Sequence, residues 1–61
     1  MPHVTIRIAA GRSTDEVREL VRRVSEAVSA SLDVPIDAVG VHIFDLPADR
    51  MGRGGRLAGD A

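Results

Sequence analysis

The sequence contains no cysteine, which excludes disulfide bonds and thiolate metal sites. Its two histidines, His3 and His42, are too few for a structural zinc site without help from carboxylates. A chain of 61 residues forms one small domain, which buries only about 60% of its unfolded surface. Domains of this size are usually stabilised by disulfides, by a metal or by other chains. We therefore expect this chain to be stabilised by oligomerisation.

Aromatic residues are scarce, and an excess of one charge and long apolar runs are missing. Phe44 is the single aromatic residue, and the formal net charge is −1 with the two signs interspersed. This balance does not favour attraction to nucleic acid or to a membrane surface. The sequence has no apolar run of about 18 residues and no signal-peptide core. We expect a cytoplasmic protein without nucleic-acid or membrane partners.

Residues 3–9 alternate between polar and apolar side chains, which is typical of a strand with one face on a core. The apolar positions are Val4, Ile6 and Ile8, and the polar positions are His3, Thr5 and Arg7. Residues 39–44 repeat this pattern, with Val39, Val41 and Ile43 alternating with Gly40, His42 and Phe44. The sequence thus predicts two half-buried strands.

The segment between the strands has the signals of an amphipathic helix. Ser13 is a typical N-cap, and Glu16 three residues later completes a capping box. Apolar residues then recur at helical spacing for about 17–20 residues. These are Val17, Leu20, Val21, Val24, Ala27, Val28 and Leu32. Pro35 disfavours the helical conformation at Val34, so the helix ends near Asp33.

A strand, a helix and a strand with short connections predict an α/β fold built on a single βαβ unit. Its strands are parallel and its crossover is right-handed. One helix covers one sheet face, so the polar face has no cover within the chain, and a two-stranded sheet is not stable alone. Gly52-Arg53-Gly54-Gly55 in the tail predicts a short C-terminal hairpin that packs on a neighbouring subunit. It is not a phosphate loop, because the required lysine and helix are missing.

The first two residues, Met1-Pro2, carry the main chemical hypothesis. If Met1 is removed, Pro2 becomes the N-terminus and carries a secondary amine. Free α-amino groups titrate at about 7.7–8.0, and burial or a neighbouring cation lowers that pKa. Such an amine can take up and release a proton near neutral pH. The sequence therefore offers Pro2 as a catalytic base, with His3 beside it as a residue that tunes its pKa.

In these features the chain resembles the 4-oxalocrotonate tautomerase family over Pro2 to about Ala58. Individually the shared segments are common, but their combination in register is specific. The segments are Met1-Pro2, Gly11-Arg12-Ser13, Val24-Ser25-Glu26-Ala27, Ser31-Leu32-Asp33-Val34-Pro35 and Gly52-Arg53-Gly54-Gly55-Arg56-Leu57-Ala58.

The resemblance implies that residues 1–61 are a single tautomerase-like domain, an isomerase without metal or organic cofactor. It implies that Pro2 is the general base and then the general acid, moving a proton in small 2-oxo or 2-hydroxy-dienoic acids. Arg12 matches the arginine that engages the carboxylate or 2-oxo end of the substrate. The family forms dimers and hexamers, as a trimer of dimers, with pocket residues from more than one subunit.

Two positions depart from the family pattern. Gly40 stands where the best-studied members have a second arginine, and Met51 stands where they have an aromatic residue. Met51 keeps an apolar pocket wall. His42 is our candidate replacement for the missing cation and a second substrate-binding residue, with Arg50 and Arg53 as alternatives.

Three alternative functions remain open from the sequence. Gly40 leaves room for a catalytically weak or non-catalytic partner subunit of a hetero-oligomer. The same scaffold can run a hydratase or dehalogenase reaction, for which only Asp45 and Asp49 offer a carboxylate. The third is a ribbon-helix-helix DNA-binding protein that reads bases with Thr5 and Arg7, but residues 39–46 alternate as a strand where that fold needs a helix.

Overall fold

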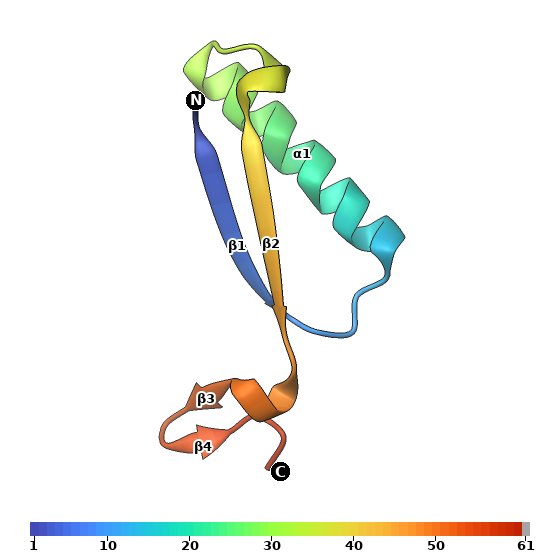
Figure 1. Cartoon of the computed structure of the whole chain (residues 1–61), viewed down its shortest axis with the longest axis vertical. Helices are drawn as coiled ribbons and strands as arrows, with labels where there is room; N and C mark the ends of the chain where they lie inside the picture. Colours follow the sequence, from blue (N-terminus) through green and yellow to red (C-terminus); the bar gives the residue numbers. More distant parts are fainter. Residues whose placement is uncertain (61) are drawn as a thin grey trace.

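The computed structural model describes residues 1–60, which form a parallel strand pair, a long helix and a small C-terminal hairpin (Figure 1). The elements are β1 His3–Ala9, α1 Thr14–Leu32, η1 Ile36–Ala38, β2 Gly40–Leu46, η2 Ala48–Arg50, β3 Gly52–Arg53 and β4 Arg56–Leu57. The two η elements are single turns of 3-10 helix. The predicted α/β fold with one βαβ unit and a hairpin is confirmed.

Strands β1 and β2 pair in parallel, from His3 opposite Gly40 to Ala9 opposite Leu46. Along β1 the burial alternates as the sequence predicts: the three apolar positions are half-buried and the three polar ones are exposed. Helix α1 covers the apolar face (Figure 1). The opposite face has no cover within residues 1–60, and we call it the open face. It presents His3, Thr5, Arg7, Gly40, His42 and Phe44.

The start of α1 is as predicted. The Ser13 side chain accepts a hydrogen bond from the Glu16 N–H at 3.1 Å, and the Glu16 carboxylate accepts one from the Ser13 N–H, also at 3.1 Å. The helix ends where Asp33 adopts a left-handed conformation with φ 54°, directly before Val34-Pro35. These end signals act within one or two turns of chain, which is why the sequence alone locates both ends of the helix.

One part of the predicted apolar stripe is wrong. Leu32 is 59% exposed, and Ala27, at the edge of the stripe, is exposed too. The 19 residues of α1 span about 28 Å, whereas the seven residues of β1 span about 23 Å. The helix is therefore about one turn longer than the sheet, and Leu32 in its last turn has no sheet to pack on.

The C-terminal hairpin extends beyond the end of the sheet (Figure 1). Its strands, β3 and β4, pair antiparallel around Gly54 and Gly55. Both glycines have positive φ, 63° and 80°. A two-residue hairpin turn with positive φ at both positions strongly favours glycine, which explains this pair. The hairpin is the one that the sequence predicts.

The single chain does not enclose a core. None of residues 1–60 is fully buried, while Phe44 on the open face and Leu57 on β4 are 54% and 43% exposed. The radius of gyration is 14.5 Å, against about 10.5 Å for a compact domain of this length. No helix in the described part of the chain is long and apolar enough to cross a membrane.

Candidate active site

Pro2 lies at the beginning of the sheet and is held there by the second strand. Its carbonyl oxygen accepts a hydrogen bond from the Gly40 N–H at 2.9 Å. Pro2 is half-buried, whereas Met1 before it is 83% exposed. The first residue of β2 thus fixes the backbone of the residue whose amine is the candidate base. We call this part of the molecule the Pro2 end.

Two imidazoles occupy the open face at the Pro2 end. The rings of His3 and His42 are stacked, with centroids 5.7 Å apart and an angle of 23° between the planes. A Cβ atom added at Gly40 would lie 2.7 Å from His3 Nδ1 and 3.5 Å from His42 Nε2. The His3 ring therefore fills the space that a side chain at position 40 would need. The prediction that His42 shares the strand face of Gly40 is confirmed.

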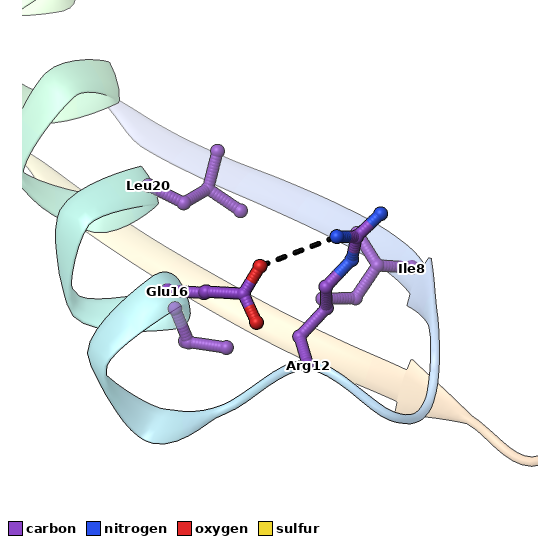
Figure 2. Close-up of a pocket in the computed structure, with 5 residues that line it drawn as sticks. Ile8, Arg12, Glu16 and Leu20 are labelled. Atoms are coloured by element: carbon purple, nitrogen blue, oxygen red, sulfur yellow. Dashed lines mark hydrogen bonds and ion pairs between the residues drawn. The ribbon is translucent and has the colours of Figure 1, made fainter.

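Arg12 lies at the other end of the sheet, in the turn that leads from β1 into α1. The preceding Gly11 makes this turn with φ 118°. The Arg12 guanidinium donates a hydrogen bond from Nη1 to Glu16 Oε2 at 3.2 Å, and Figure 2 shows Glu16 reaching from α1 toward it. A pocket of about 180 Å³ lies around this pair. It is lined by Ile8, Arg12, Glu16, Val17 and Leu20.

Glu16 accepts hydrogen bonds both at the start of the helix, from Ser13, and from the Arg12 guanidinium. The Ser13 backbone N–H, the Arg12 guanidinium and the Ser13 hydroxyl all hold the pKa of the Glu16 carboxyl below its ordinary value. The Arg12 side chain remains 68% exposed. A guanidinium has five N–H donors, and Glu16 takes one of them. Arg12 is thus an oriented cation that keeps donors for a carboxylate.

The structure does not bring Pro2 and Arg12 together within one chain. Pro2 precedes β1 and Arg12 follows it, so the seven-residue strand lies between them (Figure 1). An extended strand of that length spans about 23 Å. A small carboxylic acid cannot bridge this distance. Each chain therefore presents two separate groups of candidate residues, at the Pro2 end and at what we call the Arg12 end.

Met51 is the single residue between η2 and β3, at the Arg12 end of the chain's fold. It is half-buried, and its carbonyl oxygen accepts a hydrogen bond from the Ala58 N–H at 2.7 Å. Arg50 forms an ion pair with Asp49 at 3.3 Å, and Arg53 is exposed on β3. Both arginines are beyond the C-terminal end of β2. Of the three candidates to replace a cation at position 40, only His42 is next to Gly40 in the same chain.

The bond between Arg12 and Glu16 was not expected from the sequence. Glu16 was expected only to stabilise the start of the helix, although Arg12 and Glu16 are four residues apart. That spacing is the usual signal for an ion pair along a helix. Here Arg12 lies before the first helical residue, directly after the turn at Gly11, and its side chain still reaches Glu16.

Three comparisons with known proteins agree. A family model described as tautomerase enzyme matches residues 2–61. The chain is 45% identical over 58 residues to a 2-hydroxymuconate tautomerase of Pseudomonas putida, covering 95% of this chain and 92% of the relative.

Solved structures show the same likeness. An apo unfused 4-OT is 36% identical and superposes with a TM-score of 0.89, covering 95% of both chains. A heterohexamer 4-oxalocrotonate tautomerase from Chloroflexus aurantiacus J-10-fl is 33% identical, with a TM-score of 0.91, covering 98% of this chain and 97% of that one. The sequence and the fold thus agree over nearly the whole length, and the chain belongs to the 4-oxalocrotonate tautomerase family and is an isomerase of the tautomerase type.

Proposed function

We propose that Pro2, once Met1 is removed, moves a proton between atoms of a small 2-oxo acid or its enol. The observation that carries this proposal is the Gly40–Pro2 hydrogen bond of 2.9 Å, which fixes the backbone of a half-buried Pro2 at the beginning of the sheet. The match of the whole chain to a family of tautomerases supports it. A fixed amine is what proton transfer to and from a bound substrate requires.

The reaction consists of two proton transfers and consumes no reactant other than the substrate. The neutral Pro2 nitrogen takes a proton from the enol hydroxyl, and the electron pair of that O–H bond forms the carbonyl. The conjugated double bonds shift along the chain of the substrate. The protonated amine then returns its proton to a carbon, which restores the neutral base. This base is most effective when its pKa lies near the working pH.

Arg12 is the substrate-binding cation in this proposal. Its exposed guanidinium is planar and binds a carboxylate through two parallel hydrogen bonds. Met51 supplies an apolar wall at the same end of the sheet. Since the relative from Pseudomonas putida is a 2-hydroxymuconate tautomerase, the substrate class we propose is 2-hydroxy-dienoic and 2-oxo acids with one or two carboxylates.

The active site then needs at least two chains, because Pro2 and Arg12 are at opposite ends of β1. A two-fold axis perpendicular to β1 makes the strands of two copies antiparallel, which places the Pro2 end of one copy beside the Arg12 end of the other. Oligomerisation also covers the exposed Phe44, which lies toward the Arg12 end of the open face. We propose a hexamer built as a trimer of dimers, either from identical chains or as a heterohexamer like the Chloroflexus relative.

The test uses purified protein whose intact mass shows that Met1 has been removed. We expect ketonisation of 2-hydroxymuconate or phenylenolpyruvate, followed by absorbance. Replacement of Pro2 by alanine exchanges the secondary amine for a primary one and lowers kcat/KM by roughly 100-fold or more. Processed protein that turns over neither substrate, or a Pro2→Ala variant with full activity, would contradict the proposal.

A second candidate function is a non-catalytic partner subunit in a hetero-oligomer. Gly40 favours it, because this position offers no side chain to the Pro2 end. In that case the protein alone is inactive, and activity appears only after a second family member is added. The hydratase or dehalogenase variant has less support, since Asp49 pairs with Arg50 and Asp45 contributes to a pocket on the helix side of the sheet.

A further inference from the structure

We propose that His3 and His42 together form the group that binds the anionic oxygen of the substrate's enolate beside Pro2, and that Gly40 is glycine in order to make room for them. This inference rests on the proposed function and names the residues that complete its site. It assigns the electrophile at the Pro2 end to a pair of imidazoles.

The first observation is how the two rings converge. His3 Nδ1 and His42 Nε2 lie 2.7 Å and 3.5 Å from the point where a Cβ of residue 40 would stand. Both nitrogens thus border the same small space on the open face. His3 comes from β1 and His42 from β2, and the parallel register, with His3 opposite Gly40, brings them to this point.

The second observation is that this space adjoins Pro2. Gly40 donates its backbone N–H to the Pro2 carbonyl oxygen at 2.9 Å, and His3 directly follows Pro2 in the chain. When the amine removes a proton from the substrate, negative charge develops on an oxygen conjugated with the reacting carbon. Hydrogen-bond donors already in position for that charge are a large source of catalysis. His3 and His42 bring two imidazole donors to this end of the open face.

The third observation concerns the surrounding charges. Among residues 1–60, Arg7 on β1 is the charged residue of the open face, and β2 contributes Gly40, His42 and Phe44 to it. Helix α1 packs on the opposite face. No carboxylate of the described chain therefore lies on this face to bind either imidazole. Neither side chain has a hydrogen-bond partner in residues 1–60, and both are exposed. The pair is available to bind an anion.

Gly40 permits this arrangement for a steric reason. Real Cβ atoms essentially never approach another heavy atom to 2.7 Å, so any side chain at position 40 pushes the His3 ring away. Gly40→Ala therefore moves the imidazole without removing any functional group. It tests the position of His3 separately from its chemistry.

The first measurement is steady-state kinetics of the Met1-processed enzyme with 2-hydroxymuconate. We expect His3→Gln and His42→Gln to lower kcat/KM by roughly 10- to 100-fold, mostly through kcat, because the contact strengthens as charge develops. Gly40→Ala is expected to lower kcat/KM in the wild-type background and to have no further effect in the His3→Gln background. Thr5→Val is the matched control, since it changes a neighbouring residue on the same face and removes no imidazole.

The second measurement does not depend on turnover. Oxalate is a planar dianion that resembles the enolate of a 2-oxo acid. We expect oxalate to shift the NMR signals of both imidazole rings in histidine-labelled protein, in the wild type and in Pro2→Ala alike. Unchanged ring signals overturn the inference, and so does full kcat/KM in both histidine variants.

Failure of the proposed function gives a different result from failure of this inference. If Pro2→Ala is inactive while the histidine variants keep full activity, only the inference is wrong. If Pro2→Ala keeps full activity, the proposed role of Pro2 is wrong and the inference that depends on it is withdrawn. Circular dichroism and gel filtration on each variant exclude loss of fold or assembly as the cause of an effect.

Discussion

Pro2 and Arg12 are separated by the full length of β1, one residue before the strand and the other three residues after it. The half-buried Pro2 is held by Gly40, and the exposed Arg12 is held by Glu16. A chemical step that uses both must take them from different chains. The following predictions test this arrangement and the forces that maintain it.

Mixed oligomers of two impaired variants should recover activity. Pro2→Ala retains an intact Arg12 end, and Arg12→Ala retains an intact Pro2 end. If each site takes these two residues from different chains, random mixing of equal amounts restores about a quarter of the sites. The measurement is kcat after the two variants are unfolded together and refolded. Variants refolded separately and then assayed together are the control, and absence of recovery in the mixed sample indicates that one chain supplies both residues.

Arg12→Ala is expected to lower kcat/KM for a dicarboxylate substrate by roughly 10- to 100-fold, because a bidentate bond to a carboxylate is lost. Arg12→Lys should recover only part of this, since an ammonium lacks the planar fork of donors. Arg23→Ala is the matched control: Arg23 is another exposed arginine, and it pairs with Glu19 at 2.8 Å on the outer side of α1. Equal effects of the Arg12 and Arg23 substitutions would show that neither binds substrate.

The carboxylates of α1 make stability depend on acid pH. Hydrogen bonds from Arg22 and Arg23 lower the pKa of Glu19 from 4.5 to about 2. The Ser13 backbone N–H and Arg12 lower that of Glu16. As the pH falls, Glu19 and Glu16 therefore bind protons at higher pH in the unfolded chain than in the folded one. Their stabilisation is present above about pH 5 and is lost progressively below it. Urea unfolding between pH 7 and pH 3 should show this loss.

Glu19→Gln is expected to make the free energy of unfolding depend less on pH below about pH 5, and to lower it at pH 7. Glu26→Gln is the control, as it removes the other carboxylate bound to Arg22, at 2.8 Å, and leaves the two arginines on Glu19 in place. An identical pH dependence in wild type and Glu19→Gln would exclude Glu19 as the group responsible.

Phe44 should be required for assembly. It is 54% exposed in the single chain and lies toward the Arg12 end of the open face, and we propose that other copies cover this end. Phe44→Ser removes an apolar side chain worth about 1.5–3 kcal/mol when fully buried. Analytical ultracentrifugation should then show dissociation at protein concentrations where the wild type stays assembled. Leu32→Ser is the control, because Leu32 is 59% exposed but lies at the end of α1. Dissociation by Leu32→Ser alone would place the interface elsewhere.

The sequence alone determined most of the fold. The ends of α1 follow from the Ser13 capping box and from Asp33-Val34-Pro35, and the strand faces follow from alternation with period 2. The hairpin follows from Gly54 and Gly55, which both need positive φ. These signals operate over a few neighbouring residues, so they can be read without knowing what the chain packs against.

The candidate site was decided by the tertiary structure. The register of β1 on β2 puts the His3 ring over Gly40 and the Gly40 N–H on Pro2, and these residues are more than thirty positions apart in the sequence. The relative lengths of α1 and β1 leave Leu32 exposed. The length and direction of β1 separate Pro2 from Arg12. Such distances depend on how strands pair and on where each element ends in space, and no local pattern encodes them.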